Sequence, residues 1–133
     1  MTNQNLAVGI PTPVKIFTWI LICAGCFFFY VYTFNPVISF PNASLDTYAA
    51  KMGFASTGVR ILGSVLALLI SVLAKNPRWL FITLISRIFI ELGDVVVGLI
   101  LDGVTANTFA LVVLASAEIW AVIRLWKVIK TNP

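Results

Sequence analysis

Four apolar runs divide the chain, and they constrain its fold more than any other feature. A helix rises about 1.5 Å per residue, so roughly 20 residues cross the ~30 Å hydrocarbon core of a bilayer. The four runs have about this length and cover residues 14–34, 55–74, 79–101 and 108–126. The sequence therefore predicts an all-α, multi-pass integral membrane protein, in which a four-helix bundle forms a single transmembrane domain over residues 1–133.

The composition excludes a water-soluble domain of this size. Hydrophobic residues make up 60% of the chain and charged residues only 11%, so too few polar side chains remain to cover a soluble core. The net charge of +4 does not indicate nucleic acid, because the basic residues flank apolar runs instead of gathering on one solvated face. A lipid bilayer is the expected partner. The chain contains no His, which removes the commonest general base and metal ligand, and we assign no metal or cofactor.

Basic residues predict the orientation. Lys51 alone lies on one side of the predicted membrane, and six basic residues lie on the other. These six are Lys15, Lys75, Arg78, Arg124, Lys127 and Lys130. The positive-inside rule therefore places both termini in the cytoplasm. We also expect the first run to be retained as a span, because it is too long for a signal peptide and lacks a cleavage site.

Residues 35–54 form the one longer connection, on the outer side. They contain the turn signals Asn35-Pro36 and Pro41-Asn42. Residues 45–54 have helical spacing, so we expect them to lie in the membrane interface or to extend the second helix.

Five ionisable residues lie within the predicted spans. Each costs about 2.5 to 3.5 kcal/mol at mid-bilayer on insertion scales, so they are expected to face one another inside the bundle. They are Arg60, Arg87, Glu91, Asp94 and Glu118. Their formal charges leave one acid without a basic partner.

Depth along each helix suggests how these residues pair. Arg60 and Asp94 lie at similar depth near the outer side, so we expect an ion pair between them. Arg87 has Glu91 one turn away on its own helix and Glu118 at nearly the same depth on the next helix. Arg87 and Glu118 are therefore expected to be coupled across the third and fourth helices.

Tyr30 lies at about the depth of Arg60 and could complete the outer end of this polar cluster. Three roles stay open for the cluster. Its residues can fix which helices pair, as buried polar groups often do. They can instead hold a small amphiphilic ligand or a partner membrane protein, or form a proton or ion pathway.

Cys23 and Cys26 lie three residues apart on one face of the first helix. They could form a redox couple acting with a quinone, but no His or helix N-terminus lies nearby to activate a thiol. The segment Cys23-Ala24-Gly25-Cys26 is equally typical of a small-residue packing patch.

The pattern resembles a DoxX-like family of small bacterial four-helix membrane proteins to which no reaction is assigned. The resemblance covers residues 14–126 and rests on Asn35-Pro36, Arg60 with Gly63, Arg87, Asp102-Gly103, and Glu118. It implies a four-span bundle in the cell inner (plasma) membrane, with Arg60, Arg87, Asp102 and Glu118 as a polar signature. The chain departs from the family pattern at Ser86, where Gly is expected, and by adding Glu91 and Asp94.

The sequence thus leaves three functions open. The first is a non-enzymatic binding or accessory protein that uses the Arg/Glu/Asp cluster, alone, as a homo-oligomer or in a larger membrane complex. The second is a redox or quinone-linked membrane enzyme that uses Cys23 and Cys26. The third is a small proton-coupled transporter, although the small multidrug transporters carry their essential acid in the first helix, where this chain has none.

Overall fold

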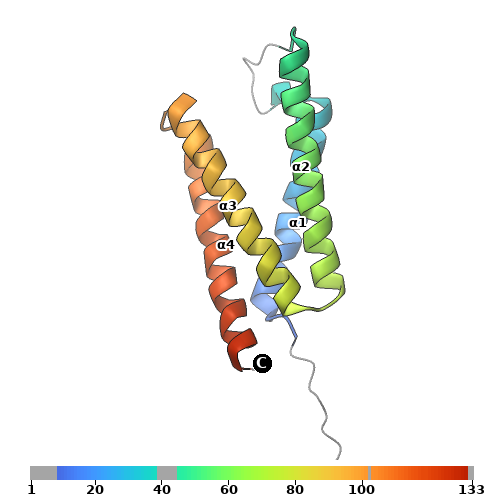
Figure 1. Cartoon of the computed structure of the whole chain (residues 1–133), viewed down its shortest axis with the longest axis vertical. Helices are drawn as coiled ribbons and strands as arrows, with labels where there is room; N and C mark the ends of the chain where they lie inside the picture. The colour runs from blue at the N-terminus through green and yellow to red at the C-terminus, as the bar shows by residue number, and fades with distance from the viewer. Residues whose placement is uncertain (1–8, 39–44, 102, 132–133) are drawn as a thin grey trace, which may run out of the picture. The chain divides into compact units, whose positions relative to one another are not determined.

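The computed structural model describes residues 9–38, 45–101 and 103–131, and these are helical apart from short connections. The long helices are α1 (Thr12–Phe34), α2 (Tyr48–Leu73), α3 (Pro77–Leu101) and α4 (Ala106–Thr131), with a short 3-10 helix η1 (Pro36–Ile38) after α1 (Figure 1). No strand occurs in the part of the chain that the structure describes. The predicted all-α class with four long helices is confirmed.

Three of the helices, α1, α2 and α4, are long and apolar enough to cross a membrane. Large apolar side chains are also exposed on every long helix, for example Ile20 on α1, Val59 on α2, Phe89 on α3 and Phe109 on α4. Exposed apolar surface of this extent is expected in contact with lipid. The chain therefore fits a multi-pass membrane protein, whereas the bundle arrangement and the sides of the termini stay predictions.

Two helix boundaries differ from the predicted apolar runs by five residues or more, and the others agree within two residues. α2 begins at Tyr48 and not at residue 55, so residues 48–54 extend the second helix, which was one of the two alternatives. The side chain of Thr47 caps this start, because its Oγ1 accepts a hydrogen bond from the backbone N–H of Ala50 at 3.2 Å. α4 continues past residue 126 to Thr131. The turn signal Pro41-Asn42 and the acid Asp102 lie outside the described residues.

The described residues form two compact units, one within Ile16–Ile70 and one that combines residues 9–15 with those from Ser71 to Thr131. The prediction of a single transmembrane domain stays a prediction. In the Ile16–Ile70 unit, α1 and α2 approach closely at two glycines. A Cβ at Gly58 would collide with Thr33, and a Cβ at Gly25 would collide with Val65. These two contacts show that α1 and α2 are antiparallel.

One face of α2 meets α1, and this face does not include Arg60. Ser56, Arg60 and Gly63 are exposed, whereas Gly58 and Val65 on another face make the contacts with α1. Glycine in the middle of a helix is unfavourable by itself, so Gly58 is explained by the close approach that it permits.

The second unit begins with the tight turn between α2 and α3. The N–H of Lys75 donates to the carbonyl oxygen of Val72 at 3.0 Å, and the N–H of Asn76 donates to that of Ser71 at 3.2 Å. Lys75 has a φ of 51°. This pair of hydrogen bonds around a left-handed residue is a Schellman motif, with Lys in the position that Gly usually takes.

The next residue starts α3. The Oδ1 of Asn76 accepts hydrogen bonds from the backbone N–H groups of Arg78 at 3.0 Å and Trp79 at 3.2 Å. Asn76 is therefore the N-cap of α3, and Pro77 occupies the first helical position, where its missing N–H costs nothing. One residue thus closes α2 and opens α3, which makes the connection short and well defined.

α3 and α4 form an antiparallel hairpin. Near the start of α3, the ring of Phe81 stacks on Trp126 with centroids 5.6 Å apart. Near its end, a Cβ at Gly98 would lie 3.5 Å from the Oγ1 of Thr108. These contacts run in opposite directions along the two helices, and they set the register that brings the candidate site together.

Candidate functional site

Arg87 of α3 lies between two carboxylates. Its Nε donates to Oε1 of Glu118 on α4 at 2.7 Å, and its Nη2 donates to Oε1 of Glu91 at 3.0 Å. We call these three residues the Arg87 triad. The predicted contacts of Arg87 with Glu91 on its own helix and with Glu118 on the next are both confirmed.

The helices position the triad in two ways. Glu91 follows Arg87 by four residues, so both lie on one face of α3. Glu118 lies on the buried face of α4 between Ala115 and Ala121, both of which are also buried. Alanines one turn above and below allow α3 to approach closely, and the carboxylate can then reach the guanidinium directly.

The triad is largely shielded. The Glu118 side chain is 0% exposed, and those of Arg87 and Glu91 are 11% and 12% exposed. At this burial the attraction between the charges is weakly screened, and the cost of leaving any charge unpaired is correspondingly high. One guanidinium and two carboxylates leave the triad with a formal charge of −1.

Glu118 has one unsatisfied oxygen. Its Oε1 is held by Arg87, but its Oε2 is buried and has no hydrogen-bond partner among the described residues. A buried carboxylate oxygen without a donor is unfavourable in apolar surroundings, and native proteins rarely leave one. This atom can accept a hydrogen bond from a group that the described chain does not supply.

The other residues of the predicted cluster are Asp94, Arg60 and Tyr30. Asp94 lies on α3, partly buried. Arg60 and Tyr30 belong to the Ile16–Ile70 unit and are exposed there, and the Tyr30 ring lies 5.7 Å from that of Phe34. Pairing of Arg60 with Asp94 stays a prediction, as does a role for Tyr30.

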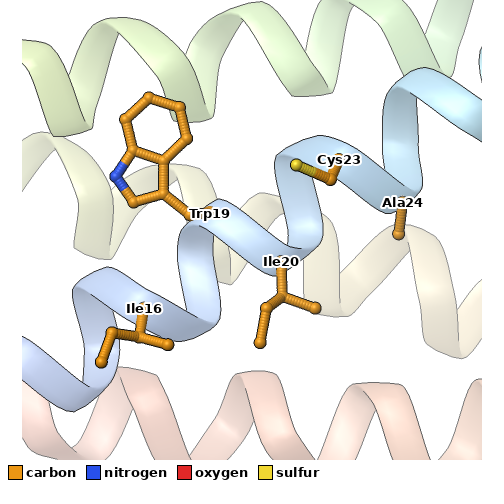
Figure 2. Close-up of a pocket in the computed structure, with 5 residues that line it drawn as sticks. All are labelled: Ile16, Trp19, Ile20, Cys23 and Ala24. Atoms are coloured by element: carbon orange, nitrogen blue, oxygen red, sulfur yellow. The ribbon is translucent and has the colours of Figure 1, made fainter.

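Both cysteines are free thiols on the exposed side of α1. Cys23 borders an open apolar hollow on the helix surface, which Figure 2 shows in close-up. The hollow is lined by Ile16, Trp19, Ile20, Cys23 and Ala24. Its lining contains no cationic side chain that would stabilise a thiolate, so this surface suits a lipid chain better than redox chemistry.

Ala115 and Ala121 also belong to the site, and they were not predicted from the sequence. Their signal is present in the sequence, because each lies three residues from Glu118, at the spacing that places small residues beside a polar one on a helix face. Among the described residues, no group of three or more His, Cys, Asp and Glu side chains could hold a metal ion.

Comparison with protein-family models, with curated proteins and with solved structures found no match.

Proposed function

We propose that this membrane protein is a non-enzymatic binding protein that holds the polar head of a small amphiphile at Glu118. The observation that carries this proposal is the buried Oε2 of Glu118, which has no hydrogen-bond partner in the described chain. A ligand that donates a hydrogen bond to Oε2 would remove the cost of this unsatisfied oxygen.

The charge of the triad favours a particular kind of head group. With two carboxylates against one guanidinium, the site carries one negative charge in excess inside an apolar hairpin. A primary amine would supply both a hydrogen bond and a balancing positive charge. The alkyl chain of such a ligand would lie along the exposed apolar surface of the helices.

Binding explains the triad better than catalysis does. The contacts of Arg87 with Glu91 and Glu118 hold both acids in ion pairs. A carboxylate engaged in this way is a positioned acceptor. The triad contains no hydroxyl or thiol that one of its acids could activate as a nucleophile.

The experiment compares probes with the same alkyl chain. Dodecylamine, dodecyltrimethylammonium and dodecanoate are added to the purified full chain in mild detergent, and thermal unfolding and native mass spectra are recorded. We expect dodecylamine to bind and to raise Tm most, because only this cation has N–H donors. Glu118→Gln should lose the effect, and Asp46→Asn, which also removes one acid, should keep it. Equal stabilisation by all three probes would refute the proposal, and so would retention of amine binding by Glu118→Gln.

Four membrane spans with both termini in the cytoplasm are part of this proposal, as is membership of the DoxX-like family. The family assignment rests on the sequence resemblance, in which Arg87 and Glu118 are two of the signature residues. Reporter fusions test the topology. Tags at both termini and at residues 75–78 should report cytoplasm, and a tag at Asp46 should report the outer side. A terminus found outside would overturn the orientation.

Proton-coupled exchange is a second candidate, favoured by the same buried carboxylate. A proton on Glu118 would then be released when a cationic amphiphile arrives. Proton release into weakly buffered solution on addition of dodecylamine would support this candidate, and binding without release would exclude it.

A further inference from the structure

We infer that one end of the α3–α4 hairpin forms a binding surface for anionic phospholipid headgroups. The surface, which we call the basic rim, consists of five exposed cationic residues around the α2–α3 turn and the end of α4. They are Lys75, Arg78, Arg124, Lys127 and Lys130. This inference does not depend on the function proposed for Glu118.

The hairpin brings the rim residues together from two parts of the chain. The stack of Phe81 on Trp126 pairs the start of α3 with the end of α4. Lys127 follows Trp126 directly, and Arg78 precedes Phe81 by less than one turn, so both lie near the same level of the hairpin. The caps at Asn76 hold the turn residues at this end.

No acid lies near the rim in the sequence. Residues 71–86 and 119–133 contain no Asp or Glu, so these segments supply no carboxylate that would neutralise the five cations. Arg124 is oriented by a cation–π contact, with its guanidinium carbon 5.8 Å from the centroid of the Trp120 ring. The rim is thus a surface of one charge sign.

Helix length places the rim at the headgroup level. α4 has 26 residues, which corresponds to about 39 Å and exceeds the ~30 Å hydrocarbon core by roughly six residues. Trp79 and Trp126 are both exposed, and exposed indoles favour the boundary between hydrocarbon and headgroups. Lys127 and Lys130 lie beyond Trp126 and therefore reach the phosphate layer.

The apolar side chains beside the rim favour a lipid over a soluble polyanion as its ligand. Exposed apolar side chains adjoin the rim on α4, such as Ile123 and Trp126, and these would lie against the acyl chains of a lipid. Basic clusters next to a span are attracted to anionic lipids, by about fivefold in affinity for each Lys or Arg near the surface. A phosphodiester with attached acyl chains matches both features.

The test uses the full chain in mild detergent doped with equal amounts of phosphatidylglycerol and phosphatidylcholine that carry the same acyl chains. Native mass spectrometry counts the lipids retained. We expect the wild-type chain to retain phosphatidylglycerol severalfold over phosphatidylcholine, with a smaller preference at high salt. Lys127→Gln should reduce the preference about fivefold and Lys127→Gln with Lys130→Gln further, whereas Lys51→Gln, a matched loss of one charge outside the rim, should not.

Three outcomes would overturn the inference. These are equal retention of the two lipids by the wild-type chain, an equal effect of Lys51→Gln and Lys127→Gln, and displacement of phosphatidylglycerol by an equal concentration of inorganic phosphate. The last result would mean an ion site without lipid recognition. The rim residues are exposed, so the variants should keep the wild-type Tm. Glu118→Gln should keep the lipid preference, which separates this test from that of the proposed function.

Discussion

Coupling between Arg87 and Glu118 is the most direct test of how the hairpin is held together. The 2.7 Å contact between them joins α3 to α4, and the Glu118 side chain is fully buried. Glu118→Gln keeps the shape of the side chain and its acceptor oxygen but removes its charge. Arg87→Leu removes the cation and leaves both acids of the triad without their basic partner.

The expected magnitudes follow from this geometry. A hydrogen bond to a charged group contributes about 1.5 to 3 kcal/mol, and breaking a buried pair costs about 3 to 5 kcal/mol in soluble proteins. In membranes the unfolded chain also finds partners, which lowers such values to ~1 kcal/mol in many cases. We therefore expect Glu118→Gln to cost about 1 to 2 kcal/mol of unfolding free energy and Arg87→Leu about 2 to 3 kcal/mol. The double variant should cost about 1 kcal/mol less than the sum.

The assay is a double-mutant cycle on equilibrium unfolding in one mixed-detergent system, with helicity as the signal. Lys130→Gln supplies the control, because it also removes one charge from α4 but lies about 18 Å along the helix from Glu118. Its effect should add to that of Arg87→Leu. Additive effects of Arg87→Leu and Glu118→Gln would mean that the ion pair does not stabilise the hairpin, and the assignment of the triad as the central site would be withdrawn.

Three further predictions address other parts of the chain. Gly58→Ala should lower the free energy of unfolding by about 1 kcal/mol or more, because the new Cβ would collide with α1, whereas Gly53→Ala on the same helix meets open space and should be neutral or stabilising. Asn76→Ala should destabilise by about 1 kcal/mol through loss of the N-cap of α3, and Asn76→Asp should not; equal loss in both variants would contradict the capping role. Cys23 and Cys26 should titrate as two thiols with or without a quinone present, since both are free and exposed; conversion to a disulfide would revive the redox hypothesis.

The contact between Arg87 and Glu118 could be predicted from the sequence because an unpaired charge inside the membrane has a large energetic cost. A guanidinium that cannot lose its proton must find an anion inside an apolar hairpin, and helix geometry leaves few carboxylates within reach. Depth along the helices then selected Glu118. The cost of an unpaired guanidinium thus predicts that an acceptor is needed and roughly how deep it lies. The buried Oε2 without a partner could be found only from the packed side chains.

The contacts of α2 illustrate where sequence reasoning is weaker. Small residues form several stripes along this helix, and their spacing does not show which stripe meets α1. The contact uses Gly58 against Thr33. Which stripe is used depends on how side chains of the partner helix fit, and differences of this kind are small in energy and invisible to periodicity.

The sequence predicts a turn between residues 74 and 79, but it does not predict the left-handed conformation of Lys75 within that turn. A helix end of this type is normally recognised by a glycine, because only glycine enters the left-handed region without strain. Here a lysine adopts φ 51°, and the turn is held by hydrogen bonds from Lys75 and Asn76 to the last turn of α2. The signal that remained in the sequence was Asn76 followed by Pro77, which is a typical helix start.

The charges of α3 explain why this helix is absent from those that length and composition select as spans, because every 18-residue stretch of α3 contains Arg87, Glu91 and Asp94. A count of charges treats each one as if it met lipid by itself, yet Arg87 is in contact with two carboxylates, one of them supplied by α4. The energetic cost of placing Arg87 in the membrane is therefore reduced when α3 and α4 pair. α4 itself is apolar enough to count as a span, because Glu118 is the only charged residue among its first 18 residues. After this pairing one negative charge is left over, and the oxygen without a partner is Oε2 of Glu118. The same ion pair that lowers the cost of burying α3 thus leaves an acceptor in the hairpin, and the proposed ligand would bind at that atom.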